Sequence, residues 1–549
     1  MRTTLFSLIV FSFFHLDAQL PFQFVVSFTD KGGEFSIEKP GDFLSERAIQ
    51  RRQKQEIEIV EEDLPVSRLY LSQVRAQTGI QIRSVSKWFN DCVIEIKDST
   101  IVAKIRSWPF VKAARLIPAN YNKSSEDRIS KLDIRMDQNL EKAHDYYGNS
   151  YVQSHMLACD YLHELGFRGR GMLLAVIDAG FLGYEGHPFL AKLQAENRVL
   201  ATRDFIDQDN YVFQQSWHGT YVLSTMAADV PGNMVGTAPE ASYLLLRSED
   251  GRAEYILEEY FWVEAAEFAD SAGADVVNTS LGYTQFDDSL QDHTYADMNG
   301  KTARISIAAS RAARKGMLIM ISAGNSGTTP WQKIGAPADA FDIISVGAVN
   351  GEENIAAFSS RGPSADGRIK PELCAMGNNV IVGNPDGTAS TSNGTSFSSP
   401  VLAGMASCLW QANPDASWKE VREALIQSGT LYSTPDTNMG YGIPNAIMAD
   451  SRLKGNIKSK VDSGPWYSIS PNPFHQKLIL TYKTEENAQV TVRFSDVQGR
   501  LVSTATHWLM AGRISYLVLE GNDIPKAAGT YVAEFITGDM VKTMKVVKY

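Results

Sequence analysis

Long apolar runs and clustered cysteines are both missing from this chain of 549 residues. Beyond the N-terminus no stretch reaches the roughly 18 consecutive apolar residues that span a membrane, so we expect no integral membrane segment. The four cysteines form no CxxC pair, which argues against cysteine-based metal binding or catalysis. Neither an HExxH nor a DxDxDG pattern occurs, so we expect no catalytic metal and can place no calcium loop.

Basic residues are also few, because 52 Lys and Arg stand against 63 Asp and Glu, a formal net charge of −11. Such an acidic chain is not expected to bind nucleic acid, since phosphate binding needs clustered Lys and Arg. The apolar fraction of 44% and the charged fraction of 21% are typical of a globular protein. The length exceeds one ordinary domain, and we expect three or four folded units.

Residues 1–18 have the pattern of a secretory signal peptide. Arg2 supplies the positive start, residues 5–16 the short apolar region, and Ala18 a small residue at the cleavage point. The alternative is a buried N-terminal strand or helix. The signal-peptide interpretation predicts an exported protein that is secreted or held at the cell surface.

Residues 19–125 predict a small α+β unit. Strands are expected at 22–28, 80–85 and 92–96, and a polar helix at 44–55. The segment 121–137 is rich in Lys, Ser, Asp and Arg, which marks an exposed linker at the end of this unit.

Residues 126–450 predict an α/β domain with a mostly parallel sheet. Strands buried on both faces read as continuous apolar runs, and helices are expected between them, on both faces of the sheet. One of these helices begins at Ser417, which forms a capping box with Glu420. The expected strands are 172–177, 243–246, 275–277, 317–321 and 343–346, and the other helices 254–272 and 302–315.

Residues 451–466 read as a linker, because Gly, Lys, Asp and Pro dominate there. Residues 467–549 then predict a small β-sandwich, because short strands recur at regular spacing with turn residues between them. The expected strands are 478–482, 490–494, 515–519, 531–536 and 544–547.

Three residues in the α/β domain point to nucleophilic catalysis. Asp178 ends an apolar strand, His218 begins a helix, and Ser396 precedes an apolar helix over residues 401–410. A carboxylate that orients a histidine, and a histidine that deprotonates a serine, would activate that hydroxyl. Taken singly, each has a structural alternative: a turn aspartate, a core histidine or a helix cap.

Asn325 follows another apolar strand and is flanked by glycines. Its amide could donate a hydrogen bond to a developing oxyanion, together with the backbone N–H of Ser396 at its helix N-terminus. The structural alternative is a turn asparagine.

Four segments together resemble the subtilisin-like serine proteases, or subtilases. They are AVIDAG (175–180), HGT (218–220), AGN (323–325) and GTSFSSP (394–400). The chain order Asp, His, Ser is that of this family, and Ser396 lies in no GxSxG elbow. The resemblance implies a subtilisin-like fold over roughly residues 150–450. It also implies hydrolysis of peptide bonds through an acyl-enzyme.

By this resemblance Ser396 is the nucleophile, His218 the general acid and base, Asp178 the orienting carboxylate and Asn325 the oxyanion donor. The expected substrate-binding residues are Ser280, Leu281, Gly282, Ala323 and Gly324, the first three on a strand that pairs with a peptide. The chain departs from the family at Ala179, where a serine or threonine is usual. That change puts a local hydrogen bond in doubt, but not the triad.

The two flanking units carry resemblances of their own. The N-terminal unit is similar to the inhibitor-type propeptide of subtilases, which implies a zymogen, and cleavage after about Asn120 is our hypothesis. The C-terminal unit resembles the sorting domain of the type IX secretion system of Bacteroidetes. The matching pieces are SPNP (470–473), DVQGRL (496–501), AGTY (528–531) and KVVKY (545–549). The secretion machinery is then a partner; the alternative is a structural or substrate-binding sandwich.

Two other functions compete with a secreted serine endopeptidase that acts on polypeptides. One is a catalytically inactive subtilase fold used as an adhesin or binding module. The other is a metallohydrolase that uses Asp178, His187 and His218, which the missing HExxH disfavours. The protease hypothesis predicts no cofactor for the chemistry, although the family allows structural calcium.

Overall fold

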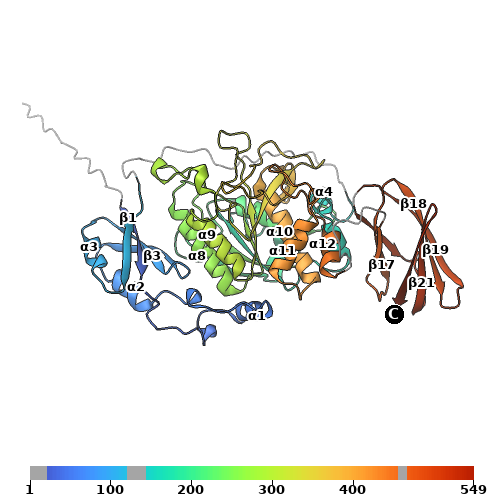
Figure 1. The fold of residues 1–549 in the computed structure, drawn as a ribbon, viewed down its shortest axis with the longest axis horizontal. Coiled ribbons are helices and arrows are strands. Elements are labelled where there is room, and N and C mark those ends of the chain that lie inside the picture. Colours follow the sequence, from blue (N-terminus) through green and yellow to red (C-terminus); the bar gives the residue numbers. More distant parts are fainter. Residues whose placement is uncertain (1–20, 120–143, 456–465, 513) are drawn as a thin grey trace, which may run out of the picture.

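The computed structural model describes residues 21–119, 144–455, 466–512 and 514–549, which form three units in a row (Figure 1). The predicted signal peptide and the whole of the predicted linker at 121–137 lie outside these residues. Within the described part of the chain, no helix is both long and apolar enough to cross a membrane.

The N-terminal unit is an antiparallel sheet of four strands in the order β2-β3-β1-β4. Phe24 and Val26 face the core that this sheet shares with its own helices. Val25 and Val93 face the other way and join the core of the central unit, as alternation along a strand requires. The elements are β1 (Phe22–Phe28), α1 (Glu46–Lys54), α2 (Arg68–Arg75), β2 (Ile80–Ser86), β3 (Asp91–Ile96), α3 (Ile101–Arg106) and β4 (Val111–Leu116).

The central unit is built on a fully parallel sheet of seven strands in the order β13-β12-β11-β10-β5-β9-β6. Every strand except the edge strand β6 is almost entirely buried, which is why most of them read as apolar runs. The strands are β5 (Leu173–Asp178), β6 (Val199–Asp204), β9 (Ser242–Arg247), β10 (Val276–Thr279), β11 (Leu318–Ser322), β12 (Ile344–Val349) and β13 (Leu373–Met376).

Helices cover both faces of this sheet, which confirms the predicted fold class. α8 (Leu257–Ala272) and α9 (Arg304–Arg314) pack on one face, while α7 (His218–Ala227) and α10 (Thr395–Ala412) pack on the other (Figure 1). The remaining elements are α4 (Tyr151–His155), α5 (Cys159–Glu164), α6 (Ala191–Ala195), β7 (Asp229–Val230), β8 (Met234–Val235), β14 (Val380–Gly383), β15 (Ala389–Ser392), α11 (Trp418–Gln427) and α12 (Ala446–Leu453).

The order of the strands opens a crevice between β5 and β10. After β5 the chain crosses to the edge strand β6 and returns through β9, whereas after β10 it continues to the opposite edge. The loops that follow β5 and β10 therefore leave in opposite directions. Ligands of parallel sheets bind at such a switch point, at the carboxyl ends of the strands.

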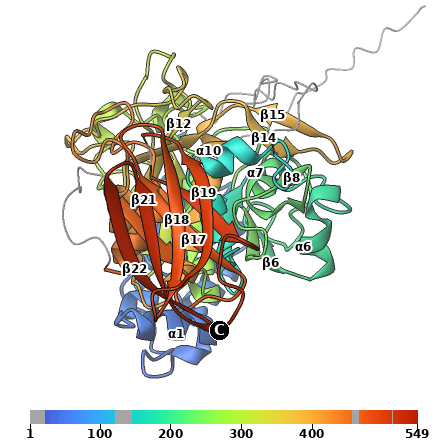
Figure 2. The same ribbon diagram turned by 90° about the vertical axis from the view of Figure 1, so that its right-hand side faces the viewer.

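The C-terminal unit is a sandwich of two antiparallel sheets, in the orders β16-β17-β20 and β19-β18-β21-β22 (Figure 2). It has an apolar core of its own. Its predicted strands are present, while β16 and β19 were not predicted, and α12 runs into the predicted linker as far as Leu453. The strands are β16 (Trp466–Ser470), β17 (Lys477–Lys483), β18 (Ala488–Asp496), β19 (Leu501–Leu509), β20 (Ser515–Glu520), β21 (Gly529–Thr537) and β22 (Met540–Lys548).

Candidate active site

Asp178 and His218 are joined by a hydrogen bond at the carboxyl edge of the sheet. Asp178 is the last residue of β5 and His218 the first residue of α7, and the imidazole Nδ1 lies 2.7 Å from the carboxylate Oδ1. Both side chains are buried. The other nitrogen, Nε2, has no hydrogen-bond partner within the described ranges, so it is the atom that can accept a proton.

The surroundings of His218 favour its charged form. Burial alone would lower the pKa of the imidazole. The negative charge of Asp178, the hydrogen bond that Nδ1–H donates to Asp178 and the more distant charge of Glu249 outweigh burial and raise this pKa above its ordinary value. An imidazolium formed by taking a proton from a nucleophile would be stabilised in the same way.

Two glycines allow His218 to approach Asp178. A Cβ atom on Gly219 would lie 2.4 Å from the carbonyl oxygen of Gly180. Gly180 itself has a φ of +138°, and a Cβ atom there would lie 2.3 Å from the carbonyl oxygen of Gln214. Because no side chain tolerates such distances, both segments need glycine for the close approach of their backbones.

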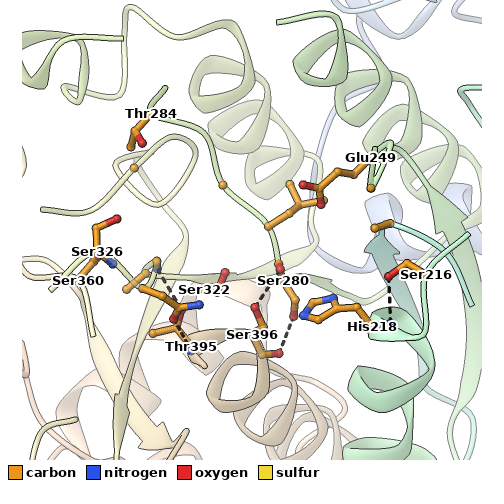
Figure 3. Close-up of a pocket in the computed structure, with 18 of the residues that line it drawn as sticks. Ser216, His218, Glu249, Ser280, Thr284, Ser322, Ser326, Ser360, Thr395 and Ser396 are labelled. Carbon is orange, nitrogen blue, oxygen red and sulfur yellow. Dashed lines mark hydrogen bonds between the residues drawn. The ribbon is translucent and has the colours of Figure 1, made fainter. Parts of the chain in front are cut away.

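Ser396 lies in the first turn of α10 and lines the same cavity as His218 (Figure 3). Its Oγ donates a hydrogen bond to the carbonyl oxygen of Ser280, at 3.2 Å. No hydrogen bond joins Ser396 to His218 among the residues described, because the Ser396 hydroxyl is engaged by the carbonyl oxygen of Ser280 instead. Catalytic hydrogen bonds often tighten only when substrate binds.

A chain of hydrogen bonds ties the end of β10 to the first turn of α10. The Ser280 hydroxyl donates to the carbonyl oxygen of Ser396 at 2.8 Å and accepts from the Asn278 amide at 2.9 Å. The Ser399 hydroxyl in turn donates to Oδ1 of Asn278 at 2.7 Å. These bonds hold Ser396 in place against the end of β10.

Thr395 determines which way the amide of Asn325 points. Oδ1 of Asn325 accepts hydrogen bonds from the backbone N–H and the hydroxyl of Thr395, each at 2.9 Å. The same hydroxyl accepts from the backbone N–H of Gly324 at 3.1 Å. The Nδ2 donor of Asn325 is thereby kept available to the cavity. Sequence reasoning missed Thr395, although the GTS segment that contains it was singled out.

One cavity of about 320 Å³ brings the predicted residues together (Figure 3). His218, Ser396 and Asn325 line it, and Asp178 lies behind His218. The five predicted substrate-binding residues form two of its walls: Ser280, Leu281 and Gly282 follow β10, while Ala323 and Gly324 follow β11. These residues follow the neighbouring parallel strands β10 and β11, and Ala179, which follows β5, lines the same cavity.

Sequence reasoning missed two charged residues on the cavity wall, Glu249 and Arg252. Arg252 forms an ion pair with Asp250 at 2.7 Å. Glu249 lies two residues beyond β9. The last residue of β9, Arg247, stands opposite Asp178 in the register of the parallel strands β5 and β9. That neighbourhood depends on strand order, which no local pattern reveals.

His187 takes no part in this cluster. It is buried, and its Nε2 lies 3.1 Å from the carbonyl oxygen of Gly383, on β14. Burial lowers the pKa of His187, so it is neutral at ordinary pH. Across the described ranges no group of three or more His, Cys, Asp and Glu side chains is arranged to hold a metal ion.

Comparison with known proteins agrees with this geometry. Residues 169–442 match the model of the subtilase family, peptidase S8. Those residues form a subtilase domain. Residues 23–131 match the peptidase S8 propeptide domain of Bacteroidota.

The subtilase is 29% identical to serine protease AprX of Bacillus subtilis over 317 residues, which is 52% of this chain and 67% of that protein. It is also 29% identical to subtilisin DY of Bacillus licheniformis over 279 residues, 50% of this chain and 89% of that protein.

The chain is therefore a serine endopeptidase of the subtilase type, made as a zymogen with a propeptide. Ala179, where the chain departs from the family, contacts the carboxylate of Asp178 through its backbone. The backbone N–H of Ala179 donates to Oδ1 of Asp178 at 2.8 Å, but Oδ2 is buried without a partner among the described residues.

Proposed function

We propose that Ser396 attacks the scissile carbonyl of a polypeptide while His218 takes its proton and Asp178 holds the imidazole. The observation that carries this assignment is the 2.7 Å bond from Nδ1 of His218 to Asp178, with Nε2 turned toward the cavity that Ser396 lines. His218 would return the proton to the leaving amine, and water would then hydrolyse the acyl-enzyme.

We infer that the peptide lies extended along Ser280, Leu281 and Gly282, and pairs with this segment as an added strand. The developing oxyanion would accept hydrogen bonds from Nδ2 of Asn325 and from the backbone N–H of Ser396. The N-terminal end of α10 adds a favourable dipole. The residue preferred at the scissile bond is a separate question, which profiling of a peptide library would answer.

Active-site labelling tests the nucleophile. A fluorophosphonate should modify the mature enzyme at Ser396, and Ser396→Ala should take up no label. A chain that folds normally yet remains unlabelled would favour the inactive adhesin or binding module instead.

The oxyanion role of Asn325 has its own test. Asn325→Ala should lower kcat about 10²–10³-fold with little change in KM, a magnitude that comes from a subtilisin. Thr395→Val keeps the shape but loses the hydroxyl, and should lower kcat less, because the backbone N–H of residue 395 still orients Asn325. Equal kcat in wild type and Asn325→Ala would exclude the role.

We also propose that the chemistry needs no cofactor. Activity that resists a chelator but not a fluorophosphonate would support this and exclude the metallohydrolase. A fall in the unfolding temperature with chelator, at unchanged initial activity, would indicate structural calcium.

Export by a signal peptide over residues 1–18 and sorting by the C-terminal sandwich through a type IX machinery complete our proposal. The order of the SPNP, DVQGRL, AGTY and KVVKY segments supports it. Fusing residues 467–549 to a reporter in a type IX-competent host should direct the reporter outside the cell. N-terminal sequencing of the mature enzyme should find a start beyond Asn120, and a start near Gln19 would contradict propeptide cleavage.

A further inference from the structure

Two of the four cysteines meet in the core of the central domain, away from the active site. Cys159 begins α5 and Cys408 lies on α10, the helix that also carries Ser396. Neither is exposed to solvent. The other two, Cys92 on β3 and Cys374 on β13, lie in different parts of the fold.

The two sulfurs share the same neighbours. The Sγ atoms of Cys159 and Cys408 lie 3.4 and 3.2 Å from the carbonyl oxygen of Thr237. They lie 3.5 and 3.8 Å from Nε2 of His163, which is itself 3.2 Å from that oxygen. Both sulfurs therefore contact the same oxygen and the same nitrogen, and each cysteine affects the pKa of the other.

A hydrogen bond at Nδ1 orients the imidazole ring of His163. Nδ1 lies 2.8 Å from the hydroxyl of Tyr147, which can donate to it, so that Nε2 carries the proton toward Thr237 and the sulfurs. Burial opposes ionisation of Cys408, but hydrogen bonds from Cys159 and His163 lower the pKa of its thiol. Cys408 is therefore the cysteine of the pair whose thiolate is favoured, and a thiolate is the nucleophile in disulfide formation.

We propose that Cys159 and Cys408 form a disulfide as the chain folds in an oxidising compartment. The thiolate of one cysteine attacks a disulfide of a small-molecule or protein oxidant and displaces one thiol. The second cysteine then attacks this mixed disulfide and displaces the other thiol, so that two cysteine protons and two electrons pass to the oxidant. The bond would tie α5, which lies soon after the propeptide, to the helix of the proposed nucleophile. Of this proposal, only the statement that the chain meets an oxidising compartment rests on the export proposed above.

The test is differential labelling of the full chain carrying Ser396→Ala, which keeps it uncleaved. The chain is refolded with reduced and oxidised glutathione, denatured, blocked with iodoacetamide, reduced, and labelled with N-ethylmaleimide. Peptide mapping should find N-ethylmaleimide on Cys159 and Cys408 and iodoacetamide on Cys92 and Cys374. Iodoacetamide on all four, or a different pair joined, would overturn the proposal.

Two variants provide matched controls. Cys374→Ser should keep the Cys159–Cys408 link, and its unfolding midpoint should fall when reductant is added. Cys159→Ser should leave Cys408 as a free thiol, with a midpoint that reductant does not change. If Cys159→Ser does not fold, the differential labelling of the chain with all four cysteines still shows whether Cys159 and Cys408 are joined. Equal sensitivity of the two variants to reductant would overturn the proposal.

Discussion

The subtilase domain holds its two neighbours in different ways. On the propeptide side, the basic side chains of Arg51, Arg52 and Lys87 converge on Asp270 of α8, at N–O distances of 2.5, 2.8 and 3.2 Å, and all are buried. On the sandwich side, Lys477 pairs with Glu164 at 2.6 Å, and these side chains are 40% and 41% exposed. The first contact is an ion cluster removed from water, whereas solvent screens the second.

Hydrogen bonds strengthen the same contrast. Glu267 of α8 accepts from the backbone N–H groups of Lys87 and Trp88, at 2.8 and 3.0 Å. The sandwich instead contributes isolated bonds, such as Tyr516 to Asp160 at 3.0 Å and Asn445 to the carbonyl oxygen of Ile514 at 3.2 Å. The propeptide is thus matched to the acids of α8, and its departure would leave these acids to be hydrated by water. Such an arrangement suits a partner that binds firmly and is later removed.

Removing the centre of the ion cluster should have the largest effect. Burial alone would raise the pKa of Asp270, but Lys87, Arg52 and Arg51 lower it to about 2. Asp270→Ala removes the carboxylate that pairs with the buried Arg51 and Lys87 and leaves Arg52 with Asp63 alone, so it should cost about 3–5 kcal/mol. Denaturant unfolding of the full chain with Ser396→Ala measures this loss. A change below about 1 kcal/mol would remove the contrast between the interfaces.

The propeptide should bind less tightly as the pH rises. Burial raises the pKa of Glu264, which contacts the backbone N–H of Val85 at 3.4 Å, to about 8. The protonated acid thus favours the complex, so its contribution is full below the ordinary pKa of about 4.5 and is lost as the pH passes 8. Because Glu264 keeps some exposure, we expect only about tenfold weaker binding at pH 8.5 than at pH 5.5.

This effect is measured at each pH as the release of the cleaved propeptide, which is monitored through the recovery of enzyme activity. Glu264→Gln has the same shape but no charge, and should make release nearly independent of pH in this range. An unchanged pH profile in Glu264→Gln would assign the dependence to another group.

Removing residues 466–549 should change catalysis little. The sandwich has its own apolar core, and none of the residues that line the active-site cavity belongs to it. We expect kcat/KM of the truncated enzyme to stay within about twofold on a short peptide substrate, since the transition-state contacts are unchanged. A loss of more than tenfold would show that the sandwich supports the active site.

The smallest effect is expected at the exposed ion pair. Glu164→Gln should cost about 0–1 kcal/mol, and less in high salt, as for exposed pairs in general. Unfolding of the same full-length background provides the direct comparison with Asp270→Ala. A cost equal to that of Asp270→Ala would mean that exposure does not distinguish the interfaces.

Local patterns predicted most elements of the fold. The buried strands, the capping box at Ser417 and the alternating strands of the sandwich depend on residues a few positions apart, so they can be read from the chain. The edge strand β6 was missed because its side chains are largely exposed and lack an apolar run. Arg51 and Arg52 belong to the predicted polar helix at 44–55, but the acid that pairs with them in the interior, Asp270, lies on α8, more than 200 positions away.

The sequence by itself determined the kinds of chemistry available: an aspartate after a strand, a histidine at a helix start, a serine before a helix and the glycines beside them. These features arise from backbone conformation and side-chain size within short segments. Only the tertiary structure decided that Ser396 rests on Ser280, that Thr395 orients Asn325, and that Glu249 faces the cavity. Such contacts depend on the order of parallel strands, because that order brings together residues far apart in the chain.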